Sequence, residues 1–212
     1  MWQQIAASFA QQRTAQRACR LGLSQLACPG RHTVTGLLCT AGRQFVDWSA
    51  DFRLFARDAW QTRSLFDPIV RGVLELLPPA APLVLALDDT HLEKTGPHIP
   101  GVAYRRDPLS PAFHTNLIRA QRCQQVSACL PYVQPAGAAR AIPISYQHVP
   151  PVPKPKREAG PDEWQLYRQR RRRENLSTAA VGTIQRLRQD LDGRWDAAQR
   201  TLVLGVDGNR RI

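Results

Sequence analysis

The clearest pattern along the chain is an apolar run that ends on two adjacent acids. The segment "LVLALDDTHLEKTG", residues 83–96, places Leu, Val and Ala directly before Asp88 and Asp89. A second run, "TLVLGVDGN", residues 201–209, repeats the pattern and reaches Asp207 after its last valine. Apolar residues at both odd and even positions are typical of central parallel strands that helices cover on both faces. The pattern therefore predicts two buried strands, each ending on a carboxylate.

Two further strands are predicted between these runs. "HTNLIRAQRCQQVSACL", residues 114–130, and "AIPISYQHV", residues 141–149, are rich in residues that favour strands. The Gly- and Pro-rich segment 95–111 predicts a loop, and the prolines of "PPVPKPK", residues 150–156, predict an exposed basic linker. The predicted order in this half of the chain is strand, strand pair, helix, strand.

The predicted helix of this half is long and strongly basic. "PDEWQLYRQRRRRENLSTAAVGTIQRLRQDLD", residues 161–192, begins with Pro161 and two acids, which suit the first turn of a helix. Between residues 164 and 188 seven arginines accompany one glutamate. The planar guanidinium group favours phosphate, so we expect contacts with a nucleic-acid backbone. The expected contact residues are Arg168, Arg170, Arg171, Arg172 and Arg173. The alternative is a solvated helix face.

The N-terminal part predicts a small helical subdomain. Val46, Phe52, Phe55 and Trp60 recur near helical spacing and predict core packing, and Ser49 is a candidate N-cap. The prolines of "LLPPAAP", residues 76–82, end the helical pattern and form a stiff linker. We therefore predict a helical subdomain over residues 1–80 and an α/β domain over residues 81–212.

The charge balance narrows the class of partner. The 212 residues contain 29 Lys plus Arg against 17 Asp plus Glu, a formal net charge of +12, which favours nucleic acid over an acidic small molecule. No apolar run reaches the roughly 18 residues that a membrane span requires, so we expect no membrane partner and a cytoplasmic protein. The five cysteines form no Cys-x-x-Cys pair and predict neither a zinc site nor a disulfide framework.

The two strand-end carboxylates suggest a metal site. Parallel strands joined by a right-handed helical crossover can lie about 4.8 Å apart, with their C-terminal ends at one edge of the sheet. Asp207 would then lie beside Asp88 or Asp89, and nearby carboxylates repel each other unless a cation lies between them. Mg2+ fits because it binds one or two carboxylates together with waters and substrate phosphates. Two such ions support in-line attack on a phosphodiester. The alternative is that each Asp simply starts a polar turn.

Several segments resemble a known family of enzymes. "LALDDTHLEKTGPHIPG", "RDPLSPAFHTNLIRAQR" and "VLGVDGN" resemble the DDE transposases of bacterial insertion sequences, a group of DDE superfamily endonucleases. The resemblance runs from about residue 32 to the C-terminus and includes "HTVTGLLCTAG" and "DWSADFRLFARDAW". It implies an α/β fold, an RNase H-like mixed sheet with helices, preceded by a small helical subdomain.

The resemblance also implies site residues. In this family one aspartate ends the first strand and a second ends the fourth, and both bind divalent metal. The second of these matches Asp207. The first is Asp88 or Asp89, and the Asp-x-Thr pattern with Thr90 favours Asp88. The family's catalytic glutamate has no counterpart, because only "GNRRI" follows "VD". We therefore expect an incomplete RNase H-like domain, truncated at its C-terminus, with little or no strand transfer by this chain alone.

The implied activity is metal-dependent cleavage and strand transfer of DNA, with Mg2+ as cofactor and Mn2+ as a substitute. The implied partners are insertion-sequence ends, target DNA, and a second copy of the chain or a full-length transposase near the nucleoid. The alternative is a non-catalytic DNA-binding protein, or a truncated product that inhibits the full-length enzyme. A standalone RNase H-like nuclease acting on other substrates is a third hypothesis.

Overall fold

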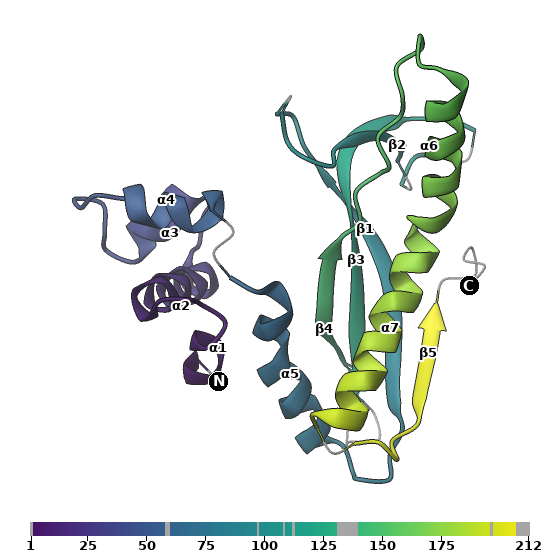
Figure 1. The fold of residues 1–212 in the computed structure, drawn as a ribbon. Helices are drawn as coiled ribbons and strands as arrows, with labels where there is room; N and C mark the ends of the chain where they lie inside the picture. The colour runs from purple at the N-terminus through teal and green to yellow at the C-terminus, as the bar shows by residue number, and fades with distance from the viewer. Residues whose placement is uncertain are drawn as a thin grey trace. The chain divides into compact units, whose positions relative to one another are not determined.

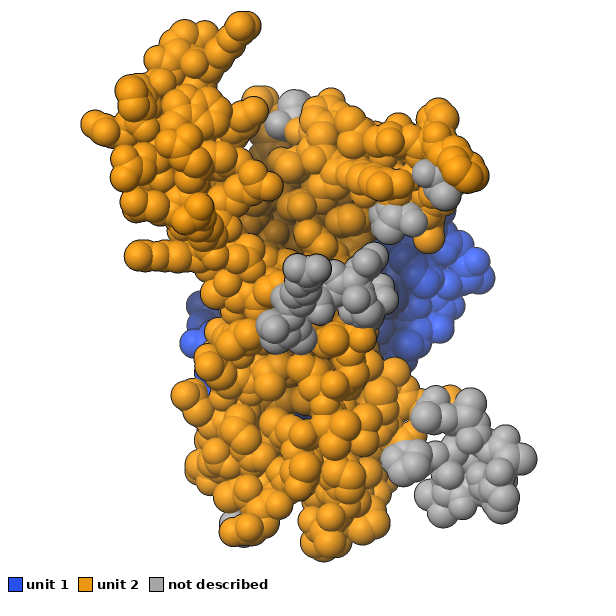
Figure 2. Space-filling model, turned by 90° about the vertical axis from the view of Figure 1, so that its right-hand side faces the viewer, with its two compact units in different colours: residues 1–72 blue, residues 73–212 orange. Residues whose placement is uncertain are grey.

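The computed structural model describes residues 2–57, 60–96, 98–107, 109–111, 113–130, 140–195 and 197–206. The chain divides into two compact units, Met1–Gly72 and Val73–Ile212 (Figure 2). The division falls within a helix, whereas the proline-based boundary near residue 80 stays a prediction.

The first unit is helical. It contains α1 (Trp2–Ala6), α2 (Gln12–Ala27), α3 (Val34–Thr40) and α4 (Ser49–Ala56), and α5 (Thr62–Leu76) runs from this unit into the second. The core of the unit is built from leucines of α2, α3 and α4, namely Leu21, Leu37, Leu38 and Leu54. Phe9 and Trp60 pack against this core, and their rings lie 6.3 Å apart. Phe52 and Phe55 of α4 are exposed, so the prediction that they belong to the core is wrong.

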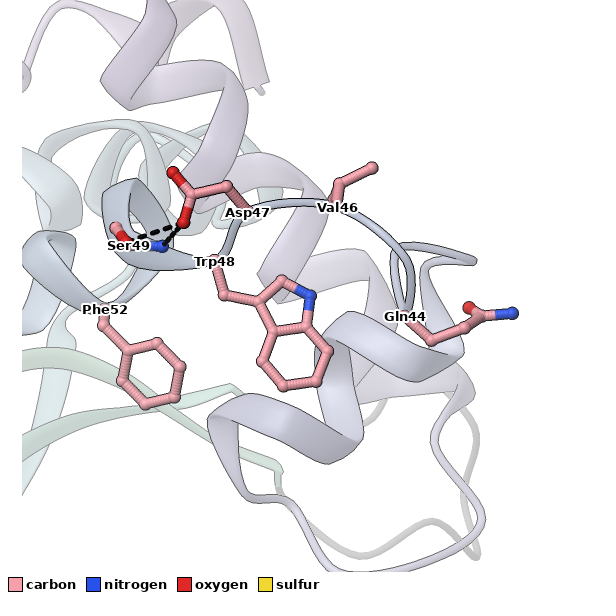
Figure 3. Close-up of a pocket in the computed structure, with 6 residues that line it drawn as sticks. All are labelled: Gln44, Val46, Asp47, Trp48, Ser49 and Phe52. Atoms are coloured by element: carbon pink, nitrogen blue, oxygen red, sulfur yellow. Dashed lines mark hydrogen bonds between the residues drawn. The ribbon is translucent and has the colours of Figure 1, made fainter.

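Helix α4 begins one residue earlier than a Ser49 cap would require. Ser49 is its first residue, and Asp47 Oδ1 accepts hydrogen bonds from the Ser49 backbone N–H (2.9 Å) and from Ser49 Oγ (2.6 Å). Asp47 and Trp48 line a shallow hollow of the first unit, together with Phe52 (Figure 3). Because Ser49 lies inside the helix, the predicted Ser49 N-cap is wrong.

The second unit is built on a mixed five-stranded sheet. Its strands are β1 (Leu83–Glu93), β2 (Ala103–Arg106), β3 (Leu117–Leu130), β4 (Arg140–His148) and β5 (Leu202–Val206). The order is β2-β3-β1-β5, with β4 also paired to β3 (Figure 1). All pairs are antiparallel except β1 with β5, which are parallel. The predicted α/β fold with a mixed sheet is therefore confirmed.

Strand β2 lies inside the segment that the sequence predicts as a loop. Its four residues pair with the start of β3, from Ala103↔Ala120 to Arg106↔Leu117. Local composition favours a loop there, because glycines and prolines flank the strand on both sides. Pairing with a distant strand overrides that preference, so the loop prediction for residues 95–111 is wrong at β2.

The predicted single helix over residues 161–192 is two helices. Helix α6 (Pro161–Arg173) has Glu174 as its C-cap, and α7 (Leu176–Gly193) begins after Asn175. Asn175 has extended backbone angles (φ −131°, ψ 174°), and its side chain accepts a hydrogen bond from the Thr178 backbone N–H. Asparagine satisfies the free N–H groups of a helix start in this way. The break occurs because Asn175 caps α7 instead of continuing α6.

Helix α7 lies across one face of the sheet (Figure 1). On the strands, Gln147 Nε2 donates to Thr183 Oγ1 of α7 at 2.7 Å and to Gln124 Oε1 at 3.0 Å. Gln124 Nε2 in turn donates to the backbone oxygen of Leu176 at the start of α7. The face that carries Gln124 and Gln147 is called the α7 face from here on.

The two strands that end near the predicted site each have one covered and one exposed face. Leu83, Leu85 and Leu87 of β1 are at most 2% exposed, whereas Val84 is 37% exposed and Val203 of β5 is 45% exposed. The prediction that helices cover both faces is therefore wrong, and the strands alternate as strands with one covered face do. The face that carries Val84, Val203 and Asp88 is called the Asp88 face.

Within the part of the chain that the structure describes, no helix combines the length and the apolar character that a membrane crossing requires.

Candidate active site at the edge of β1 and β5

Asp88 directly follows the last registered pair of the two parallel strands. The register runs from Leu83↔Leu202 to Leu87↔Val206, and Asp88 is the next residue of β1. Asp207 follows Val206 in the sequence, but it lies outside the described residues. The prediction that the two apolar runs are parallel neighbours is confirmed. The contact between their aspartates stays a prediction.

The adjacent acids Asp88 and Asp89 point to opposite faces, because successive side chains of a strand alternate. The Asp88 side chain is exposed, and its Oδ1 accepts a hydrogen bond from the Asp89 backbone N–H at 2.8 Å. On the α7 face, Asp89 Oδ2 accepts a hydrogen bond from Arg122 Nε at 2.5 Å, and the Asp89 side chain is only 16% exposed. The two carboxylates therefore have different chemical environments, although they are neighbours in the sequence.

A row of polar side chains continues from Asp88 across the sheet. Asp88 pairs with Gln125 of β3, and Gln125 pairs with Tyr146 of β4. Residues opposite each other in a sheet lie on the same face. The pKa of Tyr146 is raised to about 12, mainly by burial and secondly by a hydrogen bond with Cys123. The phenol therefore stays protonated at neutral pH and acts as a neutral neighbour of the row.

The loop after β1 is fixed against β3 beside this row. Arg119 Nη1 donates to the backbone oxygens of Thr95 (3.1 Å) and Gly96 (2.8 Å), and Gln121 Nε2 donates to Pro100 O (2.8 Å). Gln121 pairs with Leu92, which shares the Asp88 face. Two β3 side chains thus hold the backbone of the loop. No local pattern indicates this role, because the contacts join residues more than twenty positions apart.

The predicted DNA-binding arginines lie on α6. All of them have exposed side chains, namely Arg168, Arg170, Arg171, Arg172 and Arg173. The Arg170 guanidinium makes two hydrogen bonds to the Glu174 carboxylate, at 2.8 and 2.9 Å. This interaction lowers the pKa of Glu174 and raises the pKa of Arg170. Four of the five arginines are therefore outside this ion pair, and DNA contact by the five stays a prediction.

A cluster of ionisable residues on the α7 face was missed by sequence reasoning. His91 pairs with Arg122 across the sheet, and Arg105 extends from β2 on the same face. Both ring nitrogens of His91 and Nε of Arg105 are buried without a hydrogen-bond partner among the described residues. Burial, and then the charge of Arg122, lowers the pKa of both His91 and Arg105. Counting alternate positions from Asp89 would have placed His91 on this face.

The described residues include one well-suited candidate ligand for a hard cation. Asp88 offers an exposed carboxylate, the oxygen donor that Mg2+ and Mn2+ bind. Asp89 fits poorly because its charge is already engaged by Arg122. Over the described ranges, no three side chains of His, Cys, Asp or Glu gather into a metal-binding group.

The sequence matches one family across most of its length. Residues 6–201 match the family described as DDE superfamily endonuclease, a span that includes Asp88, Asp89 and the arginines of α6. The mixed sheet is consistent with the RNase H-like fold of such enzymes. Nucleases of this superfamily act on DNA and generally use divalent metal ions. No curated protein and no solved structure gives a significant match. The chain belongs to the DDE superfamily endonuclease family.

Proposed function

We propose that this chain is a transposase-type DNA endonuclease in which Asp88 and Asp207 hold a divalent metal ion, Mg2+ or Mn2+. The observation that carries the proposal is the register of β1 and β5, which ends one residue before each aspartate. Continuing the register by one step would pair Asp88 with Asp207. The alternation of β5 would then direct Asp207 to the face of Val203 and Gly205, which is the Asp88 face.

The same argument selects between the two candidate first ligands. A ligand on the Asp88 face can share a cation with Asp207, whereas Asp89 lies on the other side of the sheet. Asp89 is also paired with Arg122, and a guanidinium group competes with a metal ion for the carboxylate. Asp88 is therefore the proposed ligand, and Asp89 contributes to the packing of β1 against its neighbours.

The bound ion would polarise a water or a sugar hydroxyl for attack on a phosphodiester and would stabilise the leaving oxygen. The chain's own carboxylates would orient that reaction at the rim of the sheet. The exposed arginines of α6 would hold the DNA backbone without reading its sequence. The proposed substrates are the ends of an insertion sequence and its target DNA, bound by more than one copy of the chain.

DNA binding without cleavage is the second candidate function. It is supported by the exposed arginine cluster of α6, which can bind phosphates whether or not a metal site is complete. This candidate predicts DNA affinity that falls steeply with salt and does not require a divalent ion. It also predicts that substitutions at Asp88 leave the affinity unchanged.

Nicking of supercoiled plasmid by the 212-residue chain, in Mg2+ and in Mn2+, tests the proposal. We expect Asp88→Asn and Asp207→Asn each to reduce the rate by more than about 100-fold, because each removes a metal ligand. Glu93→Gln is the matched control, since it removes an exposed carboxylate from the same strand. We expect this control to cleave at the rate of the unmodified chain.

Undiminished cleavage by Asp88→Asn would contradict the assigned ligand. Absence of cleavage by the unmodified chain, together with salt-sensitive DNA binding, would instead favour the second candidate. A gel-shift titration on the same preparations separates the two results.

A further inference from the structure

A cavity of about 270 Å3 opens on the α7 face, away from the proposed metal site. Its walls come from β2, β3, the proline segment after β4, and the junction between α6 and α7. Three arginines line it, Arg105, Arg122 and Arg171, together with a single acid, Glu174. The arginines come from three different elements, so the fold, and not a local run of sequence, gathers them.

The polar groups beside this cavity have unsatisfied hydrogen-bonding capacity. Nε of Arg105 is buried and donates to no described group, and neither ring nitrogen of the adjacent His91 has a partner. Leaving a buried donor without a partner is unfavourable, because the donor has given up its hydrogen bonds to water. A bound acceptor would recover this cost.

The acids near the cavity are already engaged. Glu174 binds the Arg170 guanidinium through both carboxylate oxygens, and Asp89 binds Arg122. The lining therefore keeps an excess of positive charge, and the charge of Arg122 adds to burial, the main cause, in lowering the pKa of Arg105 and of His91. Asn175 and Leu176 also line the cavity, so the positive end of α7 adds to the attraction for an anion.

We propose that this cavity binds a phosphate group through Arg105, Arg122 and Arg171. Arginine suits this ligand, because its planar fork donates two parallel hydrogen bonds to phosphate oxygens. Tyr167 and the proline segment form uncharged walls that limit the size of the anion. The phosphate belongs either to a DNA backbone or to a small phosphorylated compound, and the chemistry of recognition is the same for both.

If the bound phosphate belongs to DNA, the inference rests on the proposed function. The location of the cavity does not depend on that function. Arg105 and Arg122 lie on the α7 face, whereas Asp88 lies on the opposite face of the same sheet. A phosphate held there would belong to DNA that passes around the sheet, not to the scissile phosphodiester. Binding in EDTA, where metal-dependent cleavage cannot occur, therefore tests the cavity separately from the active site.

Two binding measurements on the full chain in EDTA distinguish the sources of phosphate. In the first, inorganic pyrophosphate is titrated and the melting temperature is recorded. In the second, the affinity for a labelled DNA duplex is measured at several salt concentrations. The variants are Arg105→Gln and Arg171→Gln, and the matched control is Arg106→Gln, which removes an exposed arginine from the same strand as Arg105.

We expect Arg105→Gln and Arg171→Gln to weaken binding about tenfold more than Arg106→Gln in at least one measurement. A cavity that holds a DNA phosphate also predicts that the slope of log K against log salt falls by about 0.9 in each cavity variant. A loss confined to pyrophosphate assigns the cavity to a small phosphorylated compound. If both cavity variants match Arg106→Gln in both measurements, the proposal is overturned.

A structural role for Arg105 is tested on the same samples. Because the buried Nε of Arg105 has no partner in the described part of the chain, Arg105→Gln should not lower the melting temperature in the absence of anion. Arg171 is exposed and reports on the cavity even if Arg105→Gln folds poorly. Asp88→Asn should retain anion binding in EDTA, so failure of the proposed metal site and failure of the cavity give different results.

Discussion

Two consecutive aspartates lie on opposite faces of the sheet, and their side chains have different environments. On the α7 face, Asp89 is largely buried and paired with Arg122, within a layer of polar side chains that packs on the helix. On the other face, Asp88 is exposed and keeps a carboxylate available for a ligand. Two neighbouring acids of one strand therefore differ in role: Asp89 is the ion-pair partner of Arg122, and Asp88 is the proposed metal ligand.

The largest expected difference between the faces is in metal binding. We expect Asp88→Asn to weaken Mn2+ binding at least about tenfold, because one or two carboxylates usually supply the protein ligands of such a site. Asp89→Asn should change Mn2+ affinity by less than about twofold, since that carboxylate is engaged by Arg122 on the other face. Titration calorimetry or Mn2+ electron paramagnetic resonance measures both. Equal losses in the two variants would contradict the assignment of the metal ligand to Asp88 alone.

The second expected difference is in the free energy of unfolding, and here Asp89→Asn has the larger effect. Asp89→Asn leaves the partly buried Arg122 without its anionic partner, and we expect the free energy of unfolding to fall by about 1–3 kcal/mol. Asp88→Asn should stay within about 0.5 kcal/mol, as exposed substitutions usually do. Urea unfolding at pH 7 measures both values. A larger loss for Asp88→Asn than for Asp89→Asn would reverse the assignment of roles.

The sequence predicted the strands of the sheet better than it predicted their faces. The apolar runs before Asp88 and Asp207 correctly indicated two parallel neighbours, because local periodicity and the handedness of crossovers constrain that arrangement. The sequence did not indicate that β1 and β5 each have one exposed face. Valine and alanine at alternate positions look the same whether a helix covers them or not, so Val84 and Val203 could not be distinguished from core residues.

The elements that sequence reasoning missed have both local and long-range causes. Strand β2 forms because it pairs with β3, and the break between α6 and α7 follows from the cap that Asn175 makes. The asparagine signal was present in "ENLST" and could have been used, since Asn is a strong N-cap residue. The gathering of Arg105, Arg122 and Arg171 around one cavity had no local signal, because three separate elements supply them.

A smaller effect on stability is expected where the α7 face joins its helix. Gln147 Nε2 donates to Gln124 Oε1 and to Thr183 Oγ1, so Gln147→Leu removes the donor to Gln124 Oε1, whereas Thr183 Oγ1 still accepts a hydrogen bond from Arg186 Nη2. We expect the free energy of unfolding to fall by about 1–2 kcal/mol. The matched control is Gln125→Leu on the Asp88 face, which loses a single hydrogen bond to Ser127. Losses of equal size would show that α7 does not depend on this glutamine.

The smallest expected effect concerns Tyr146 on the Asp88 face at alkaline pH. Burial, and then the hydrogen bond with Cys123, raises the pKa of Tyr146 in the folded chain to about 12, whereas an unfolded tyrosine titrates near about 10. Between these values the unfolded chain has lost a proton that the folded chain keeps. Stability from this group is therefore fully present below pH about 10 and is lost as the pH rises toward about 12.

Tyr146→Phe removes this contribution, so its urea midpoint should fall less between pH 9 and about 11 than that of the unmodified chain. Absorbance near 295 nm gives a direct measurement, because the folded chain should lose one late-titrating phenol in the variant. If the urea midpoints of the two chains fall in parallel, Tyr146 ionises as an exposed tyrosine does. The row of side chains from Asp88 to Tyr146 is then more hydrated than its burial indicates. In that case the Asp88 face would differ from the α7 face along its whole width, and not only at the rim where Asp88 lies.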